Sequence, residues 1–170
     1  MNYQSKNTPR SLFLCRMKRG FPDAYAFING DDSSPELCGT AYFYSIFCGT
    51  LVEIQVSGIP YKSESSCSSF HGLHIHENGD CTPPFDKTGN HYNPEDAPHP
   101  MHAGDMPPLL SNCGYAYSVF YTERFHVKDI IGRSVIIHDM PDDFKTQPSG
   151  GSGNKIGCGV IRPYNINSAF

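Results

Sequence analysis

Residues 50–57 read TLVEIQVS, and their side chains alternate between apolar and polar. Val52, Ile54 and Val56 share one face of an extended chain, because successive side chains of a strand point to opposite sides. Glutamate and glutamine lie on the other face. This alternation predicts a β-strand with one face in a core and the other in water.

Similar short runs recur along the chain, and in 115–122 three tyrosines and Val119 share one face. The other runs cover residues 24–29, 39–47, 69–77, 133–138 and 157–162. Glycine and proline separate the runs, as expected where turns join strands. Seven or eight short strands of this kind predict an antiparallel sandwich or barrel.

Two long stretches lack this pattern. Residues 78–110 show no strand signal and contain seven prolines, and residues 139–156 are rich in proline, glycine and serine. Ordered loops longer than about 15 residues are uncommon unless something pins them. We therefore expect the first loop to be held by the residues that it contains.

The 170 residues suffice for one domain, which we place at residues 22–163. The formal charge is −4, but residues 1–21 carry five basic side chains and no acidic one. We expect a flexible basic arm at 1–21 and a short C-terminal tail at 164–170. The rest of the chain has eight basic and 17 acidic side chains. This balance argues against a nucleic acid partner, which requires clustered lysine and arginine.

The sequence contains no run of 18 apolar residues, so we expect no transmembrane segment. The apolar stretch at residues 12–15 is shorter than the roughly 7–15 residues of a secretion signal. The chain as written is therefore expected to be cytoplasmic. Export is the alternative if a leader has been removed.

Histidines are concentrated in one part of the chain. Six of the eight lie within 32 residues, at positions 71, 74, 76, 91, 99 and 102. His74 and His76 are two residues apart in a strand-like run, so both imidazoles project from the same face and can bind one ion. A lone histidine is more often a core or edge residue, and a histidine-rich loop can bind metal loosely. The spacing of the six favours a defined metal site.

Further metal-binding side chains follow in the long loop, at His91, His99, His102 and Asp105. Three nitrogens and one carboxylate complete a tetrahedral set of the kind that zinc takes. His138 could add a nitrogen to the pair His74 and His76, and an all-imidazole site suits copper. Seven residues for two four-coordinate ions require one shared imidazole, and its two nitrogens allow one bridge.

Six strings of the sequence carry a family resemblance. They are HGLHIHENGDC (71–81), GNHYNP (89–94), HPMHAGD (99–105), IIGRSVIIH (130–138), PDDFKTQPSGGSGNK (141–155) and CGVI (158–161). They resemble copper,zinc superoxide dismutase, and its bacterial branch more than the animal one, over about residues 24–162. The resemblance implies an all-β, eight-stranded antiparallel Greek-key barrel or sandwich. It also implies a long metal-binding loop and a second long loop over the active site.

The resemblance also assigns the metal ligands. Copper would be bound by His74, His76, His91 and His138, and zinc by His91, His99, His102 and Asp105, with His91 as the bridge. Asp142 matches a carboxylate that links a copper histidine to a zinc histidine, and such partners fix the orientation of the rings. His71 matches a structural histidine that binds no metal.

The seven cysteines are an odd number, so at least one lacks a partner within the chain. Cys81 and Cys158 match the family's disulfide, which ties the long loop to the last strand. Closing this loop of 77 residues would stabilise the fold by roughly 4 kcal/mol if strain is small. The others have no assigned partner and are expected to be buried, unreactive thiols, at Cys15, Cys38, Cys48, Cys67 and Cys113.

Lys155 stands where the family usually has arginine, at the mouth of the copper channel. Lysine keeps the charge that attracts an anion but lacks the planar fork that orients it. We therefore expect retained but slower turnover. The implied reaction is disproportionation of superoxide to oxygen and hydrogen peroxide by Cu(II)/Cu(I) cycling beside a structural zinc, with Lys155 and His91 as catalytic residues.

Two other functions fit parts of this pattern. A non-catalytic module that sequesters or delivers copper or zinc would share the ligands and differ at Lys155. A zinc hydrolase would need an open coordination position, whereas four residues already fill the zinc set. The resemblance leaves the oligomeric state open, with a homodimer as one expectation.

Overall fold

The strand expected at residues 50–57 is central to an antiparallel sheet in the computed structural model, which describes residues 20–61 and 68–165. It is β3 (Gly49–Ser57), which pairs with β2 (Cys38–Ile46) and β7 (Tyr115–Thr122). Its apolar side chains at positions 52, 54 and 56 are at most 1% exposed. The alternation thus identified the buried face of this strand correctly.

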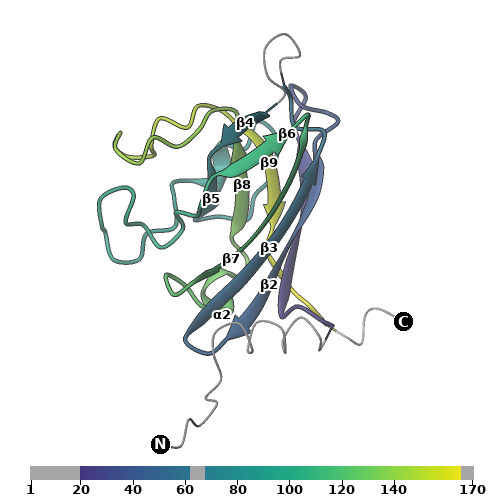
Figure 1. Cartoon of the computed structure of the whole chain (residues 1–170). Helices are drawn as coiled ribbons and strands as arrows, with labels where there is room; N and C mark the ends of the chain where they lie inside the picture. The colour runs from purple at the N-terminus through teal and green to yellow at the C-terminus, as the bar shows by residue number, and fades with distance from the viewer. Residues whose placement is uncertain (1–19, 62–67, 166–170) are drawn as a thin grey trace, which may run out of the picture.

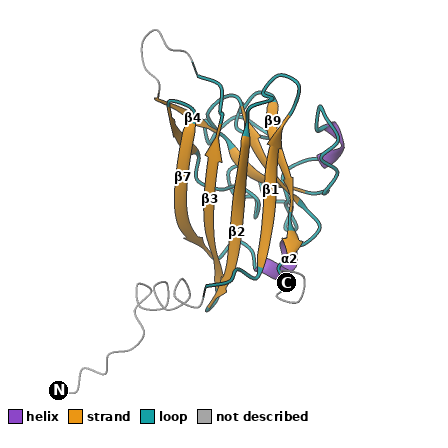
Figure 2. Cartoon of the chain, turned by 90° about the vertical axis from the view of Figure 1, so that its right-hand side faces the viewer, coloured by secondary structure: helices purple, strands orange, loops and turns teal. Residues whose placement is uncertain are grey.

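The remaining strands extend this sheet on both sides. They are β1 (Ala24–Gly30), β4 (Ser68–His71), β5 (Leu73–His76), β6 (Leu109–Asn112), β8 (Ser134–His138), β9 (Lys155–Val160) and β10 (Arg162–Pro163). The hydrogen-bonded order is β4-β6-β7-β3-β2-β1-β9-β8-β5, with β10 beside β1. Figure 2 shows the long strands β1, β2, β3 and β7 side by side.

The two ends of this order, β4 and β5, belong to one stretch of chain that changes its pairing partner at Gly72. β4 pairs with β6 and β5 pairs with β8, so the sheet curls into a nearly closed barrel. A side chain at Gly72 would come within 2.7 Å of the Ser152 hydroxyl, which explains the glycine there. The structure has ten described strands instead of the expected eight, because the stretch 68–76 is divided into β4 and β5 at Gly72 and the stretch 155–163 is divided into β9 and β10 at Ile161.

The barrel encloses one main hydrophobic core. Large side chains from different strands, among them Phe43, Ile54, Leu109 and Ile137, are at most 1% exposed. Burying one such side chain contributes roughly 1.5–3 kcal/mol. The core therefore gives the loops a stable frame.

Three short elements were not expected from the sequence. β6 begins at Leu109, inside the stretch 78–110, so the expectation of no strand there was wrong at its last two residues. Leu109 is fully buried and pairs with β4, which is why this segment is extended. The others are the single turns η1 (Asp86–Thr88) and α2 (Val127–Ile130).

The described strands lie between Ala24 and Pro163, within the domain placed at 22–163. Most of the expected arm at 1–21 and of the tail at 164–170 lies outside the described residues, so both stay predictions. Across residues 20–61 and 68–165, no helix has the length and apolar character needed to cross a membrane.

Two long loops leave the barrel on the same side (Figure 1). The first covers residues 77–108 after β5, and the second joins β8 to β9 at 139–154. Backbone hydrogen bonds hold the first loop along β5. The N–H of Ile75 donates to the Gly104 carbonyl at 2.9 Å, and the N–H of Tyr92 donates to the Ile75 carbonyl at 2.8 Å. The first loop therefore covers the outer edge of β5.

The cysteines agree only partly with expectation. Cys81 and Cys158 form the expected disulfide, with their Cα atoms 5.6 Å apart. Cys38 and Cys48 are free but exposed, and Cys113 is disulfide-bonded, so the expectation of buried, unpaired thiols was wrong for these three. Cys38 begins β2 and Cys48 lies in the turn before β3, where side chains reach solvent. The cysteines at positions 15 and 67 lie outside the described residues.

Candidate metal centre

Two neighbouring strands carry three of the histidines expected to bind copper. His74 and His76 lie on β5, with their ring centroids 6.4 Å apart. His138 ends β8, which pairs with β5. All three side chains are at most 3% exposed. Strand pairing therefore brings these imidazoles together.

The fourth imidazole of this group comes from the first loop. An antiparallel backbone bridge joins His91 to His76, and the His91 ring stacks on His74 with centroids 3.9 Å apart. A second bridge joins Asp105 to His74. The edge of β5 thus positions two separate parts of the loop.

Each of the four rings has one nitrogen without a hydrogen-bond partner among the described residues. These buried atoms are His74 Nδ1, His76 Nε2, His91 Nε2 and His138 Nε2. Ligand atoms of the four residues lie within 4.8 Å of one another. Leaving a buried polar atom unpartnered costs free energy, whereas a neutral imidazole nitrogen is a metal ligand. The four residues, named here the copper group, therefore fit a metal ion.

Hydrogen bonds at the other nitrogens fix the orientation of the strand histidines. His74 Nε2 donates to Asp142 Oδ2 at 2.8 Å, and His76 Nδ1 donates to the Gly89 carbonyl at 2.9 Å. His138 Nδ1 has a longer contact, 3.4 Å, to a loop carbonyl. Such partners select the tautomer that leaves the opposite nitrogen available to a metal.

A second group, named here the zinc group, shares His91 with the first. It consists of His91, His99, His102 and Asp105, whose ligand atoms also lie within 4.8 Å of one another. The Asp105 carboxylate lies 2.7 Å from His91 Nδ1, 3.1 Å from His99 Nδ1 and 3.3 Å from His102 Nδ1. Three imidazoles and one carboxylate form a closed tetrahedral set, which is typical of structural zinc. His91 can therefore offer one nitrogen to each group.

The pKa shifts of three copper-group histidines and of Asp105 suit metal binding. Burial lowers the pKa of His74, places that of His76 well below its usual value and lowers that of His138 to about 3. Burial alone would raise the pKa of Asp105, but the hydrogen bond from His91 and the nearby histidines hold it below its usual value. Neutral imidazoles and an ionised carboxylate are the forms that bind metals.

Asp142, from the second loop, connects the two groups. Its Oδ2 accepts from His74 Nε2 at 2.8 Å, and its Oδ1 accepts from His99 Nε2 at 2.9 Å. Burial opposes the charge, but the hydrogen bonds from His74, from the Phe144 N–H and from His99 hold the pKa of Asp142 below its usual value. The carboxylate thus lies where the resemblance implied.

Lys155 begins β9 opposite His138 and helps to line a cavity of about 390 Å³ beside the copper group. His76 and His91 line the same cavity, and Pro148 belongs to its wall from the second loop. Charge repulsion from Lys155 contributes to the low pKa of both His76 and His138. The ammonium charge is therefore close to the metal-binding nitrogens.

The sequence did not reveal what contacts Lys155. Its Nζ atom lies 2.8 Å from Thr88 Oγ1, 3.2 Å from the Gly89 carbonyl and 3.4 Å from the Phe85 carbonyl. Two of these acceptors are backbone groups, which no motif marks. His71 lies outside both groups, and its Nδ1 donates to the backbone carbonyl of His138 at 2.9 Å, which agrees with a structural role.

A β barrel that joins an all-imidazole site to a three-histidine, one-carboxylate site through a common ring defines a copper- and zinc-binding protein. The model of the family described as copper/zinc superoxide dismutase (SODC) matches residues 38–161, and the chain belongs to this family. With both metal sites intact, it is an enzyme of that family that binds copper and zinc.

Individual relatives agree with this assignment. The chain is 35% identical to the Cu-Zn superoxide dismutase of Deinococcus radiodurans over 156 residues, which cover 79% of this chain and 82% of that protein. It is 33% identical to Cu-Zn superoxide dismutase 2 of Aquifex aeolicus over 143 residues, covering 75% and 80%. The human copper chaperone for superoxide dismutase is 36% identical over 104 residues, covering 54% and 38%. The two bacterial enzymes support the resemblance to the bacterial branch.

Proposed function

We propose that the copper group disproportionates superoxide and that Lys155 supplies the charge that attracts this anion. Two superoxide anions and two protons would give one molecule of oxygen and one of hydrogen peroxide. The observation that carries the proposal is the set of four buried, unpartnered imidazole nitrogens beside the cavity that Lys155 lines. Copper bound there would supply one-electron chemistry between Cu(II) and Cu(I).

The charge distribution supports the assignment to Lys155. Beyond residue 21 the chain has eight basic and 17 acidic side chains. This part of the protein is therefore negatively charged and repels an approaching anion. Glu77 and Asp96 also line the cavity, and Lys155 is the one lysine or arginine among its described lining residues. Its local field therefore has to offset these two carboxylates.

We assign the proton transfer to His91. Its Nδ1 lies 2.7 Å from the Asp105 carboxylate, and its Nε2 has no partner among the described residues. His91 Nε2 is also the nitrogen that the copper group offers to its ion, so it would hold a proton only in the half of the cycle in which it does not bind copper. It would take up that proton while one superoxide is oxidised to oxygen. It would then give the proton, together with one from water, to the second superoxide, which is reduced to hydrogen peroxide.

Superoxide decay after pulse radiolysis tests this proposal. The full chain, loaded with one equivalent each of copper and zinc, should accelerate the decay through many turnovers. The same chain loaded with zinc alone should not, because zinc performs no redox chemistry. Full copper content without catalytic decay would contradict the proposal.

A second candidate is delivery or storage of copper without catalysis. It is favoured by the match to the human copper chaperone for superoxide dismutase over part of this chain. A delivery module should give up its copper readily to a competing chelator and leave superoxide decay unchanged. Retention of copper together with catalysis would contradict this candidate.

We also propose that the chain forms a homodimer. Phe70 and Leu110 lie opposite each other on β4 and β6, with 54% and 44% of their surface exposed. An apolar pair on the outer face of a sheet supports a protein interface. Sedimentation velocity should give the dimer mass for the chain and the monomer mass after Phe70→Ser with Leu110→Ser. A monomeric parent chain would contradict the proposed homodimer.

The cellular compartment also stays a prediction. The sequence led to an expected cytoplasmic location, with export as the alternative. The Cys81–Cys158 disulfide supports export, because disulfides persist mainly in oxidising compartments. Fractionation of cells that produce the full chain would decide between the two.

A further inference from the structure

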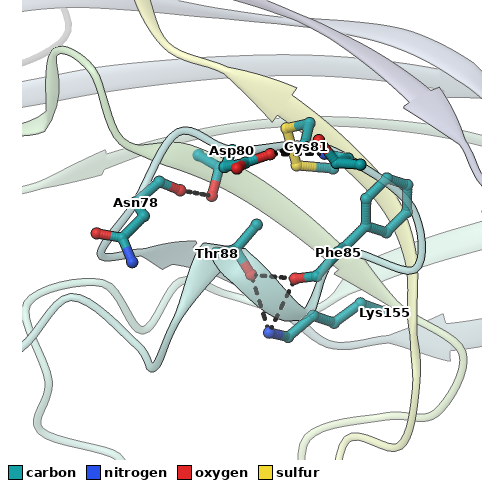
Figure 3. The surroundings of a disulfide bond; sticks show 9 residues. Asn78, Asp80, Cys81, Phe85, Thr88 and Lys155 are labelled. Atoms are coloured by element: carbon teal, nitrogen blue, oxygen red, sulfur yellow. Dashed lines mark hydrogen bonds between the residues drawn. A yellow bond between two sulfur atoms is a disulfide. The ribbon is translucent and has the colours of Figure 1, made fainter.

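The Lys155 ammonium lies against the turn η1, beside Thr88 and the Phe85 carbonyl (Figure 3). Three oxygens surround it, from Thr88 Oγ1 at 2.8 Å, Gly89 O at 3.2 Å and Phe85 O at 3.4 Å. A lysine ammonium has three N–H donors and no acceptor. These three oxygens can therefore engage all of its donors.

Thr88 provides the shortest of the three contacts, and its hydroxyl has a fixed direction. The residue is fully buried, and its Oγ1 donates to the Phe85 carbonyl at 2.7 Å. A carbonyl can only accept, so the hydroxyl hydrogen is committed to Phe85. The lone pairs of Thr88 Oγ1 are then available to Lys155.

One of the three oxygens around the Lys155 ammonium also contacts the copper group. The Gly89 carbonyl accepts from Lys155 Nζ at 3.2 Å and from His76 Nδ1 at 2.9 Å. His76 is one of the four copper-group histidines. One backbone carbonyl thus relates the position of the ammonium to the position of a metal-binding ring.

We infer that Thr88 is a positioning residue, whose hydroxyl fixes the Lys155 ammonium beside the copper group so that anions are captured by a charge held in place. This inference rests on the role of Lys155 in the proposed function. Because all three donors can be engaged within the chain, an incoming anion gains attraction from the charge and needs no free N–H. The attraction depends on distance, so it depends on what holds the ammonium.

A purely structural role for the same contact makes a different prediction. In that role Thr88 and Lys155 only fasten the first loop to β9, and Thr88→Val loosens the loop whether or not residue 155 carries a positive charge. The two roles differ in whether the effect of Thr88→Val requires Lys155. A double-mutant cycle with Lys155→Gln separates them.

Azide binding to the full chain loaded with copper and zinc, followed by the visible absorption of copper, tests the inference without superoxide chemistry. Thr88→Val should weaken azide binding roughly five-fold, because an ammonium released from Thr88 can move away from the copper group and its attraction for the anion falls with distance. Thr88→Ser, which keeps the hydroxyl, should recover most of the affinity. Thr82→Val is the matched control, since Thr82 lies in the same loop but bonds Asp80 instead. In the Lys155→Gln background, Thr88→Val should have no further effect.

Unchanged azide affinity in Thr88→Val, or an equal loss in the Lys155→Gln background, would overturn the inference. If the valine variant does not fold, Thr88→Cys replaces it in the same azide measurements. The cysteine side chain is similar in size to threonine, and its thiol accepts a hydrogen bond from Lys155 only weakly. A parent chain that binds azide but removes no superoxide would refute the proposed function and leave the inference standing. A parent chain that removes superoxide, with azide affinity unaffected by Thr88→Val, would refute the inference alone.

Discussion

The Asp142 carboxylate accepts a hydrogen bond of 2.8 Å from the His74 imidazole, although 68 residues separate them in the sequence. Its other oxygen accepts from His99 at 2.9 Å, so one side chain orients a ring of each metal group. We predict that Asp142→Asn lowers zinc affinity by about 10- to 100-fold, because an amide cannot accept from both rings. Competition with a chromogenic chelator measures this loss.

Asp143→Asn is the control for this prediction. Asp143 is adjacent and exposed, and it bonds the Thr146 hydroxyl and loop N–H groups instead of a histidine. Its replacement should leave zinc affinity within about two-fold of the parent. Equal zinc loss in both variants would indicate a general loosening of the loop and would contradict the role given to Asp142.

The Cys81–Cys158 disulfide closes a loop of 77 residues across the copper side of the barrel. Replacing both cysteines with alanine should lower the free energy of unfolding by roughly 4 kcal/mol on the chain-entropy model. Urea denaturation of the metal-free chain measures the change. Cys38→Ala removes an exposed free thiol and should change stability by no more than about 0.5 kcal/mol. A disulfide-free chain as stable as the parent would refute the prediction.

The buried histidines predict how the stability of the metal-free chain depends on pH. Burial lowers the pKa of His138 from 6.5 to about 3, and it lowers those of His74 and His76 as well. Between these values the unfolded chain binds protons that the folded chain does not. Stability should therefore fall as the pH falls below 6.5 and continue to fall toward pH 3.

Melting temperatures of the metal-free chain between pH 7 and pH 4.5 check this dependence. His138→Gln removes one lowered pKa and should make the slope shallower. His126→Gln changes an exposed histidine outside both metal groups and should keep the parent slope. A melting temperature that stays constant or rises as the pH falls would contradict the assigned neutral histidines.

Lys155→Arg should raise the rate constant for superoxide removal at low salt, by several-fold. Guanidinium has five N–H donors in a planar fork, so some would remain for the anion after the loop oxygens are satisfied. Lys87→Arg makes the same change at an exposed site of the same loop and should leave the rate constant unchanged. No gain, or a decrease, in Lys155→Arg would show that the mouth of the site works differently.

Much of the fold and of the metal site could be predicted from local pattern. The two-residue spacing of His74 and His76 fixes both rings on one face of a strand, and the alternation in β3 fixes its buried side. β6 escaped prediction because Leu109 and Leu110 are adjacent apolar residues without alternation at the end of a proline-rich loop. Its pairing with β4 is a tertiary contact that no local pattern shows.

The surroundings of Lys155 could not be predicted for a related reason. Its acceptors are set by the path of the loop through η1, and two of the three are backbone carbonyls. The exposed position of Cys48 likewise depends on a tight turn between β2 and β3. Spacing identified the metal ligands, whereas the groups that position the nearby charge depend on the folded loop.

Native mass spectrometry of the chain reconstituted with excess copper and zinc tests the central claim most directly, because it counts the ions held by two groups that share His91. The account predicts one copper and one zinc per chain. It also predicts loss of the mixed two-metal species when His91 is replaced by alanine. A parent chain that binds a single ion, or a variant that keeps both ions, would contradict the shared-ring site.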